Sequence, residues 1–173
     1  MITSKFYKDY FALQNSLDTR ISELETIHTK HLMCKNKCAE CCMSFRILPI
    51  EFYAISHEIQ TKSIEFAENI APEKCKFLIQ NSCSIYAFRP FICRTQGLPN
   101  VYFNEDQEAW DLSICELNFT NVPNEYFTED NCLNMDAFNT ELFELNQQFI
   151  EENPSLGYSP TDLIDINDLK IKD

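Results

Sequence analysis

The sequence predicts a mostly α-helical chain, a small α+β domain in which a long helix near each end encloses short β pairs. Two stretches, 6–32 and 135–149, place apolar residues three or four positions apart, which is the spacing of an amphipathic helix. All nine cysteines lie between them. A chain of 173 residues without repeats or an internal linker suits one domain, 1–173.

The N-terminal helix is predicted from Phe6 to Leu32. Charged residues separate its apolar positions, so one stripe of the helix is expected to be buried. Thr3 or Ser4 can cap the first turn by accepting a backbone hydrogen bond. The apolar stripe consists of Phe6, Tyr10, Leu13, Leu17, Ile21, Leu24 and Ile27.

Two further helices are predicted after the first group of cysteines. Pro49 suits the first turn of a helix, where its missing N–H is not needed, and Phe52, Ile55 and Ile59 then share one face. A shorter helix over 63–70 is expected to end before Pro72, because the residue before a proline avoids helical backbone angles.

Two extended pairs are predicted between the helices. Residues 75–79 and 83–88 are rich in β-branched and aromatic side chains, and the polar turn 80–82 separates them. A second pair is expected within 101–119, around the polar turn 104–106.

The last long helix is predicted to begin after Asn134, a candidate N-cap. Prolines, a glycine and many acidic residues follow it, so we expect an exposed, flexible tail over about 154–173. The apolar stripe of this helix consists of Met135, Phe138, Leu142, Leu145 and Phe149.

The charge balance excludes some partners. A net charge of −13 repels phosphate backbones and anionic lipids, so we expect neither a nucleic-acid nor a membrane partner. The first residues lack the apolar core of an export signal, and no run of about 18 apolar residues occurs. We therefore expect a cytoplasmic protein with reduced thiols, whose acidic surface would suit cationic protein partners.

The cysteine pattern is the strongest functional signal in the chain. An odd number of thiols without an export signal argues against a disulfide framework and favours metal ligands. Thiolates select zinc, copper(I) or iron, alone or in an iron–sulfur cluster. The expected ligands are Cys34-x3-Cys38-x2-Cys41-Cys42, followed by Cys75, Cys83 and Cys93.

Seven thiolates fall one short of two tetrahedral sites, and three arrangements stand open. One thiolate could bridge two metals, an eighth ligand could come from His31 or Cys115, or four thiolates could hold an iron–sulfur cluster. We include Cys115 among the expected ligands, whereas Cys132 is a weaker candidate. Cys41 and Cys42 project in different directions as neighbours, so they are expected to serve two metals or opposite sides of a cluster.

Arg89 and Arg94 bracket Cys93 in an otherwise acidic chain. Their guanidinium groups could donate hydrogen bonds to thiolates and offset the negative charge of a metal centre. Alternatively, both arginines form ordinary ion pairs with carboxylates. No glycine lies near 34–42 in the sequence, although zinc knuckles usually place one there so that backbone amides reach the sulfurs. The sequence singles out no catalytic residue.

The cysteine pattern resembles the YkgJ-type family of zinc- or iron-chelating cysteine-cluster proteins over a core motif, 34–94. The resemblance implies a metal-binding domain. A related cluster in bacterial flagellin lysine methylases implies an alternative, an iron–sulfur enzyme that transfers methyl groups from S-adenosylmethionine. The matching motifs are Cys34-x3-Cys38-x2-Cys41-Cys42, Cys75-Lys-Phe-Leu, and Cys83-Ser-Ile-Tyr-Ala-Phe-Arg-Pro-Phe-Ile-Cys93-Arg94.

These interpretations predict different sites. A closed, fully thiolate-ligated site favours chelation, whereas an open iron position facing a cleft with acidic groups favours the enzyme. A third interpretation, an adaptor that its metal merely stabilises, predicts a broad exposed apolar patch away from the cysteines.

Overall fold

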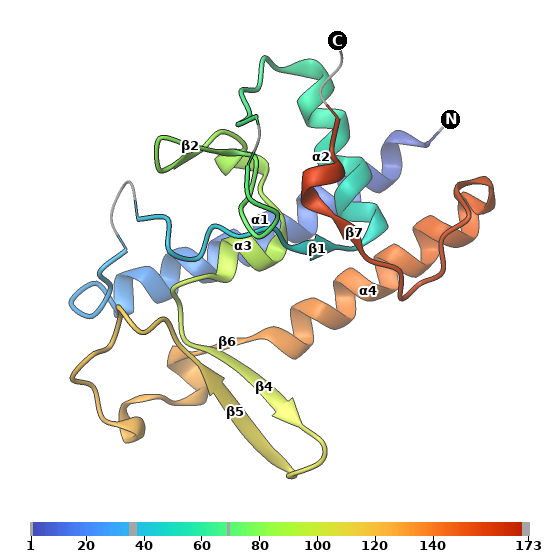
Figure 1. Ribbon diagram of the computed structural model, residues 1–173. Helices are drawn as coiled ribbons and strands as arrows, with labels where there is room; N and C mark the ends of the chain where they lie inside the picture. Colours follow the sequence, from blue (N-terminus) through green and yellow to red (C-terminus); the bar gives the residue numbers. More distant parts are fainter. Residues whose placement is uncertain (1, 35–37, 69, 171–173) are drawn as a thin grey trace.

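The computed structural model describes residues 2–34, 38–68 and 70–170, which form a small mixed α+β domain (Figure 1). None of the helices in these ranges combines the length and the apolar character needed to cross a bilayer. The α-helices are α1 Ser4–Ile27, α2 Pro49–Thr61, α3 Phe91–Thr95 and α4 Met135–Glu152. The strands are β1 Arg46–Ile47, β2 Leu78–Ile79, β3 Ser82–Cys83, β4 Asn100–Asn104, β5 Ala109–Ser113, β6 Leu133–Asn134 and β7 Ile164–Asp165.

The three longest helices, α1, α2 and α4, pack against one another around the main core (Figure 1). Most of the α1 stripe is buried as predicted, but Leu13 is only partly buried and Ile27 is half exposed. The helix ends at Ile27, and the chain turns before Leu32. Pro49 opens α2, and the Asn134 side chain caps α4 by accepting two backbone N–H groups, as predicted for both helices. This core provides the rigid support for the cysteine-rich segments.

A second core lies around the far end of α2. Ile55 and Ile59 of α2 pack there with Phe77 and with Ile166 and Leu169 near the C-terminus. The expected exposed tail therefore differs from the structure between 164 and 169, where β7 also pairs antiparallel with β1. The reason is the two fully buried apolar side chains, which remove more apolar surface from water than an exposed tail would.

The second predicted β pair forms, whereas the first forms only at its turn, because Tyr86–Phe88 is a 3-10 helix and not part of a strand. β2 and β3 make a tight hairpin around Gln80 and Asn81, whose φ angles are 47° and 62°, the signature of a turn that matches the twist of paired strands. β4 and β5 pair antiparallel and project from the helices (Figure 1). β6, which the sequence did not reveal, runs parallel to β4 and leads directly into α4.

The predicted helix over 63–70 is wrong for residues 63–68 and 70, which are not helical; residue 69 lies outside the described residues. Ile64 packs onto the second core, and the backbone N–H of Ala67 donates to the carbonyl of Lys76 at 2.7 Å. A segment of this length gains little from helical hydrogen bonds alone, so the tertiary contacts decide its conformation.

Candidate metal centre

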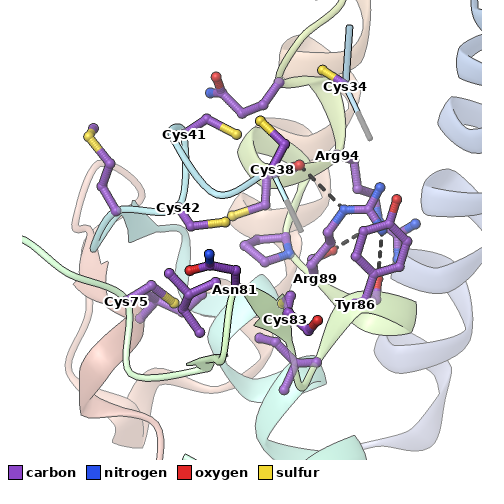
Figure 2. Close-up of a pocket in the computed structure, with 18 of the residues that line it drawn as sticks. Cys34, Cys38, Cys41, Cys42, Cys75, Asn81, Cys83, Tyr86, Arg89 and Arg94 are labelled. Atoms are coloured by element: carbon purple, nitrogen blue, oxygen red, sulfur yellow. Dashed lines mark hydrogen bonds between the residues drawn. The ribbon is translucent and has the colours of Figure 1, made fainter. Parts of the chain in front are cut away.

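Seven cysteines line one cavity of about 630 Å³ (Figure 2). They come from the segment after α1, from the entry to β2, from β3 and from α3. All nine cysteines of the chain are free thiols. The seven that line the cavity are Cys34, Cys38, Cys41, Cys42, Cys75, Cys83 and Cys93.

Backbone pairing brings the distant cysteines to this cavity. An isolated bridge between Met43 and Lys74 places Cys42 and Cys75 on adjacent extended segments. Cys83 reaches the same wall because the β2–β3 hairpin sets it opposite Leu78. These pairings span only a few residues each, so the cysteine-bearing wall has little regular structure of its own.

Cys93 enters from α3, and a buried carboxylate holds the start of that helix. Oε1 of Glu51 accepts hydrogen bonds from the Phe91 backbone N–H at 3.0 Å and from the Tyr10 hydroxyl at 3.4 Å. Oε2 of the same carboxylate accepts from the Leu48 N–H at 3.2 Å. Glu51 therefore connects α1, α2 and the start of α3, the helix that carries Cys93.

A smaller cavity of about 360 Å³ adjoins the first, because Cys41, Gln96 and Leu98 line both. Cys115 lines this second cavity together with the carboxylates Glu40 and Glu116. The eighth expected ligand is thus next to the cluster although it lies 22 residues beyond Cys93 in sequence.

The close approach of one thiol to the backbone involves a glycine that the sequence did not place there. Gly97 has φ +93°, and a Cβ atom on it would lie 2.7 Å from the sulfur of Cys34. Any side chain at this position would therefore displace Cys34. The sequence has no glycine near 34–42, but in the folded chain Gly97, from a distant segment, lies beside the Cys34 sulfur.

The thiols lie close enough to influence one another's ionisation. Burial first, and then the neighbouring Cys115, Cys38 and Cys41, raise the pKa of Cys34. The pKa of Cys93 is raised by burial and then by Cys75 and Cys83. Crowded thiolates repel each other, and a bound cation offsets this repulsion.

The pKa values of the neighbours Cys41 and Cys42 are shifted in opposite directions. The Cys41 thiol donates toward the Cys42 sulfur, which raises the pKa of Cys41 and lowers that of Cys42. After burial, Cys83 and Cys75 are the neighbouring charges that oppose this lowering at Cys42. Cys42 is therefore the thiol that ionises most readily among those with a shifted pKa.

The two arginines occupy different positions. Arg94 is buried and pairs with Asp18 at 2.6 Å, while it also donates to the carbonyls of Arg89 and Ala87. Arg89 lies over the Tyr86 ring at 3.7 Å (Figure 2). Its charge offsets part of the rise in the pKa of Cys93 that burial and the neighbouring thiols cause. Among the described residues neither guanidinium donates to a cysteine sulfur, so their role at a cofactor remains a prediction.

Two other candidates lie outside both cavities. His31 stacks on Phe119 with ring centroids 6.1 Å apart and lines neither cavity. Cys132 is buried, and its carbonyl accepts a hydrogen bond from Arg20 at 3.3 Å. These positions separate both residues from the eight thiols at the cavities.

The β4–β5 hairpin carries an exposed apolar face. Phe103 and Trp110 are register partners whose rings meet at 5.5 Å, and the Trp110 side chain is 56% exposed. Leu112 and Ile114 continue this face, and Ile114 lines the smaller cysteine cavity. The adaptor interpretation requires an exposed patch away from the cysteines, whereas this one reaches them.

The donor set fits a metal that prefers sulfur. The cavity wall supplies seven free thiols. Within the described ranges, no three His, Cys, Asp or Glu side chains are already arranged to hold one ion. The thiols are thus gathered at a cavity without forming a finished coordination shell, and side-chain rotation would have to bring them together.

We expect the buried carboxyl of Glu51 to make stability depend on pH. Burial raises its pKa from 4.5 to about 7, so the folded chain holds this proton more tightly than the unfolded chain. The stability it contributes is therefore fully present below pH 4.5 and is lost as the pH rises through 7. Between pH 4.5 and 7 the unfolding free energy of wild type should fall by about 3 kcal/mol relative to that of Glu51→Gln, which carries no titrating group at this position.

Urea denaturation of both proteins at several pH values measures this difference. Glu58→Gln is the matched control, because Glu58 lies on the same helix, is only partly buried and pairs with Lys62. The control should follow the wild-type pH profile. Parallel profiles for Glu51→Gln and wild type would contradict the assignment of the titration to Glu51.

A small α+β domain that gathers free thiols at one cavity defines the class of cysteine-cluster metal-binding domains. A family model described as "CxxCxxCC: Putative zinc- or iron-chelating domain" matches residues 33–116. The match over these residues confirms the resemblance to YkgJ-type cysteine-cluster proteins. All eight thiols at the two cavities fall within the matched residues, and Cys132 falls outside them.

No curated protein and no solved structure matches the chain. The family description names zinc and iron as the chelated metals. It mentions neither an iron–sulfur cluster nor methyl transfer, and both stay predictions from the resemblance.

Proposed function

We propose that the chain binds zinc or iron through the thiolates of its cysteine cluster. The observation that carries this proposal is the convergence of seven free thiols from separate segments on one cavity, with an eighth at its border. Soft thiolate donors prefer zinc and iron over hard cations. When bound, such an ion neutralises the negative charge that the thiolates would otherwise share.

We infer that the thiols divide into two groups of four. The thiols that act on the pKa of Cys34 are Cys115, Cys38 and Cys41. Those that act on the pKa of Cys42 are Cys41, which donates to its sulfur, and then Cys83, Cys75 and Cys93. Cys41 adjoins both groups, and we assign it to the first because Cys42 has three other thiols around it. Four thiolates make one tetrahedral shell, so each group matches the needs of one mononuclear ion. This division supports the expectation that adjacent Cys41 and Cys42 serve different metals.

Cys115 is a better eighth ligand than His31. Cys115 lines the smaller cavity and its carbonyl accepts the Asn118 N–H at 2.9 Å, close to Cys34. With Cys115 included, no thiolate has to bridge two ions. An iron–sulfur centre held by one group of four remains the alternative, and a lysine-methylating enzyme would require that centre together with S-adenosylmethionine.

Elemental analysis of the anaerobically purified chain tests the proposal. We expect about two zinc or iron ions per chain, one for each group of four thiols. Cys38→Ser and Cys42→Ser belong to different groups, so each should lose one ion and keep the other. Cys132→Ser is the matched control, because this thiol lines neither cavity and should leave the metal content unchanged.

Three outcomes would contradict parts of this proposal. A wild-type chain without stoichiometric metal would overturn it as a whole. Equal loss of metal in Cys132→Ser would overturn the ligand set. Iron accompanied by acid-labile sulfide and visible charge-transfer absorption would replace the mononuclear sites with an iron–sulfur cluster.

A further inference from the structure

One buried amide beside the cluster has a hydrogen-bond partner for its oxygen and two for its nitrogen. Asn118 is 1% exposed, and its Oδ1 accepts the backbone N–H of Met33 at 2.7 Å. Its Nδ2 donates to the carbonyl of Gly97 at 2.6 Å and to the sulfur of Cys34 at 3.3 Å. Both hydrogens of the amide nitrogen and the amide oxygen therefore have a partner.

These partners fix which way the amide faces. Rotating the side-chain amide by half a turn would set its nitrogen against the Met33 N–H and its oxygen against the Gly97 carbonyl. Both contacts would then bring like groups together, at a buried position where unsatisfied polar groups are costly. The N–H group that points at the Cys34 sulfur is therefore held there by two backbone contacts.

The group of four thiols around Cys34, called here the first thiol group, comes from two distant segments of the chain. The backbone around Asn118 connects these segments. Its own N–H donates to the carbonyl of Cys115, and the next residue, Phe119, donates to the carbonyl of His31 at 3.1 Å. Phe119 has φ 58°, which turns the chain sharply after the amide. The segment that carries Cys115 is thereby joined to the segment that leads into Cys34.

The sulfur of Cys34 lies between the Asn118 amide and the bare backbone of Gly97. A Cβ at Gly97 would lie 2.7 Å from this sulfur and 3.3 Å from the amide nitrogen. The glycine thus leaves the space that the sulfur needs, and the amide supplies a directed donor. Together they fix the position of the Cys34 sulfur, which lines the larger cavity.

We propose that Asn118 is a positioning residue for a metal ligand: its side-chain N–H holds the Cys34 sulfur toward the cavity and stabilises its negative charge once a metal is bound. This inference rests on the proposed function, since Cys34 must be a ligand. In known metal sites, hydrogen-bond donors and acceptors that orient the residues bound to the metal contribute strongly to metal affinity. Asn118 lies two residues beyond the matched stretch 33–116.

Zinc titration of the metal-free full-length chain, with a competing chelator, tests the role of Asn118. Asn118→Ala should weaken affinity for the first thiol group by roughly 10- to 100-fold. Asn118→Asp keeps the shape and the bond from Met33 but turns an oxygen toward the sulfur, so it should weaken binding further. If the alanine variant does not fold, the near-isosteric aspartate variant carries the test.

A double-mutant cycle separates positioning from a general structural role. In a Cys34→Ala background the thiolate is absent, so Asn118→Ala should no longer change zinc affinity at the remaining thiols. Asn146→Ala is the structural control: this fully buried asparagine also makes two backbone hydrogen bonds, to Ile50 and Pro160, but lines neither cavity. It should lower thermal stability and leave zinc affinity unchanged.

The outcomes distinguish the two proposals. Equal losses of affinity from Asn118→Ala with and without Cys34 would overturn the positioning role and leave the metal-binding function standing. Wild-type affinity in both Asn118 variants would do the same. A wild-type chain that takes up no zinc and no iron would overturn both proposals together.

Discussion

Removing the bound metal with a chelator should sharply lower the thermal stability of the purified protein. An ion present at about 1,000 times its Kd adds about 4 kcal/mol to the free energy of unfolding, because it binds only the folded chain. The effect should be local first. The thiol-bearing wall rests on two-residue strands and an isolated bridge, whereas α1, α2 and α4 have a core of their own.

Thermal denaturation and hydrogen exchange, with and without metal, measure this loss. We expect faster exchange in 38–45 and 70–85 after chelation, while α1 and α4 stay protected. Cys132→Ser should respond to the chelator as wild type does. If the chelator changes neither the melting temperature nor the exchange pattern of the metal-loaded protein, the metal does not stabilise the thiol-bearing wall.

Phe149→Ala should lower the free energy of unfolding by about 3–5 kcal/mol, the cost of deleting a buried aromatic side chain and leaving a cavity. Phe149 is fully buried in α4. Its ring meets Phe6 edge to face at 5.4 Å and lies 5.6 Å from the Tyr53 ring. One substitution therefore removes contacts among α1, α2 and α4 together.

The same helix offers a matched control. Phe143→Ala deletes the same atoms from α4, but the Phe143 side chain is 38% exposed and outside the main core. It should cost well under half as much in urea denaturation. Because the core supports the cavity only indirectly, Phe149→Ala should keep its metal content below its melting temperature. Similar costs for both variants would contradict the burial of Phe149.

Local sequence signals located most of the elements. Pro49 and Asn134 mark the starts of α2 and α4 because their chemistry suits a first helical turn regardless of distant contacts. The turn at Gln80 and Asn81 is equally local. The helix expected over 63–70 does not form, for the opposite reason. The conformation of this segment is decided by its hydrogen bond to Lys76 and by its packing on the second core, and the sequence reveals neither contact.

The chemistry of the candidate site follows from the sequence alone, because the number and spacing of the thiols already favour a sulfur-liganded metal. Which thiols share a neighbourhood was decided only by tertiary structure. Cys115, Gly97 and Asn118 come to Cys34 from segments more than 60 residues away, through backbone pairing and turns. Residue type determines what a side chain can bind, whereas long-range packing determines which side chains can bind together.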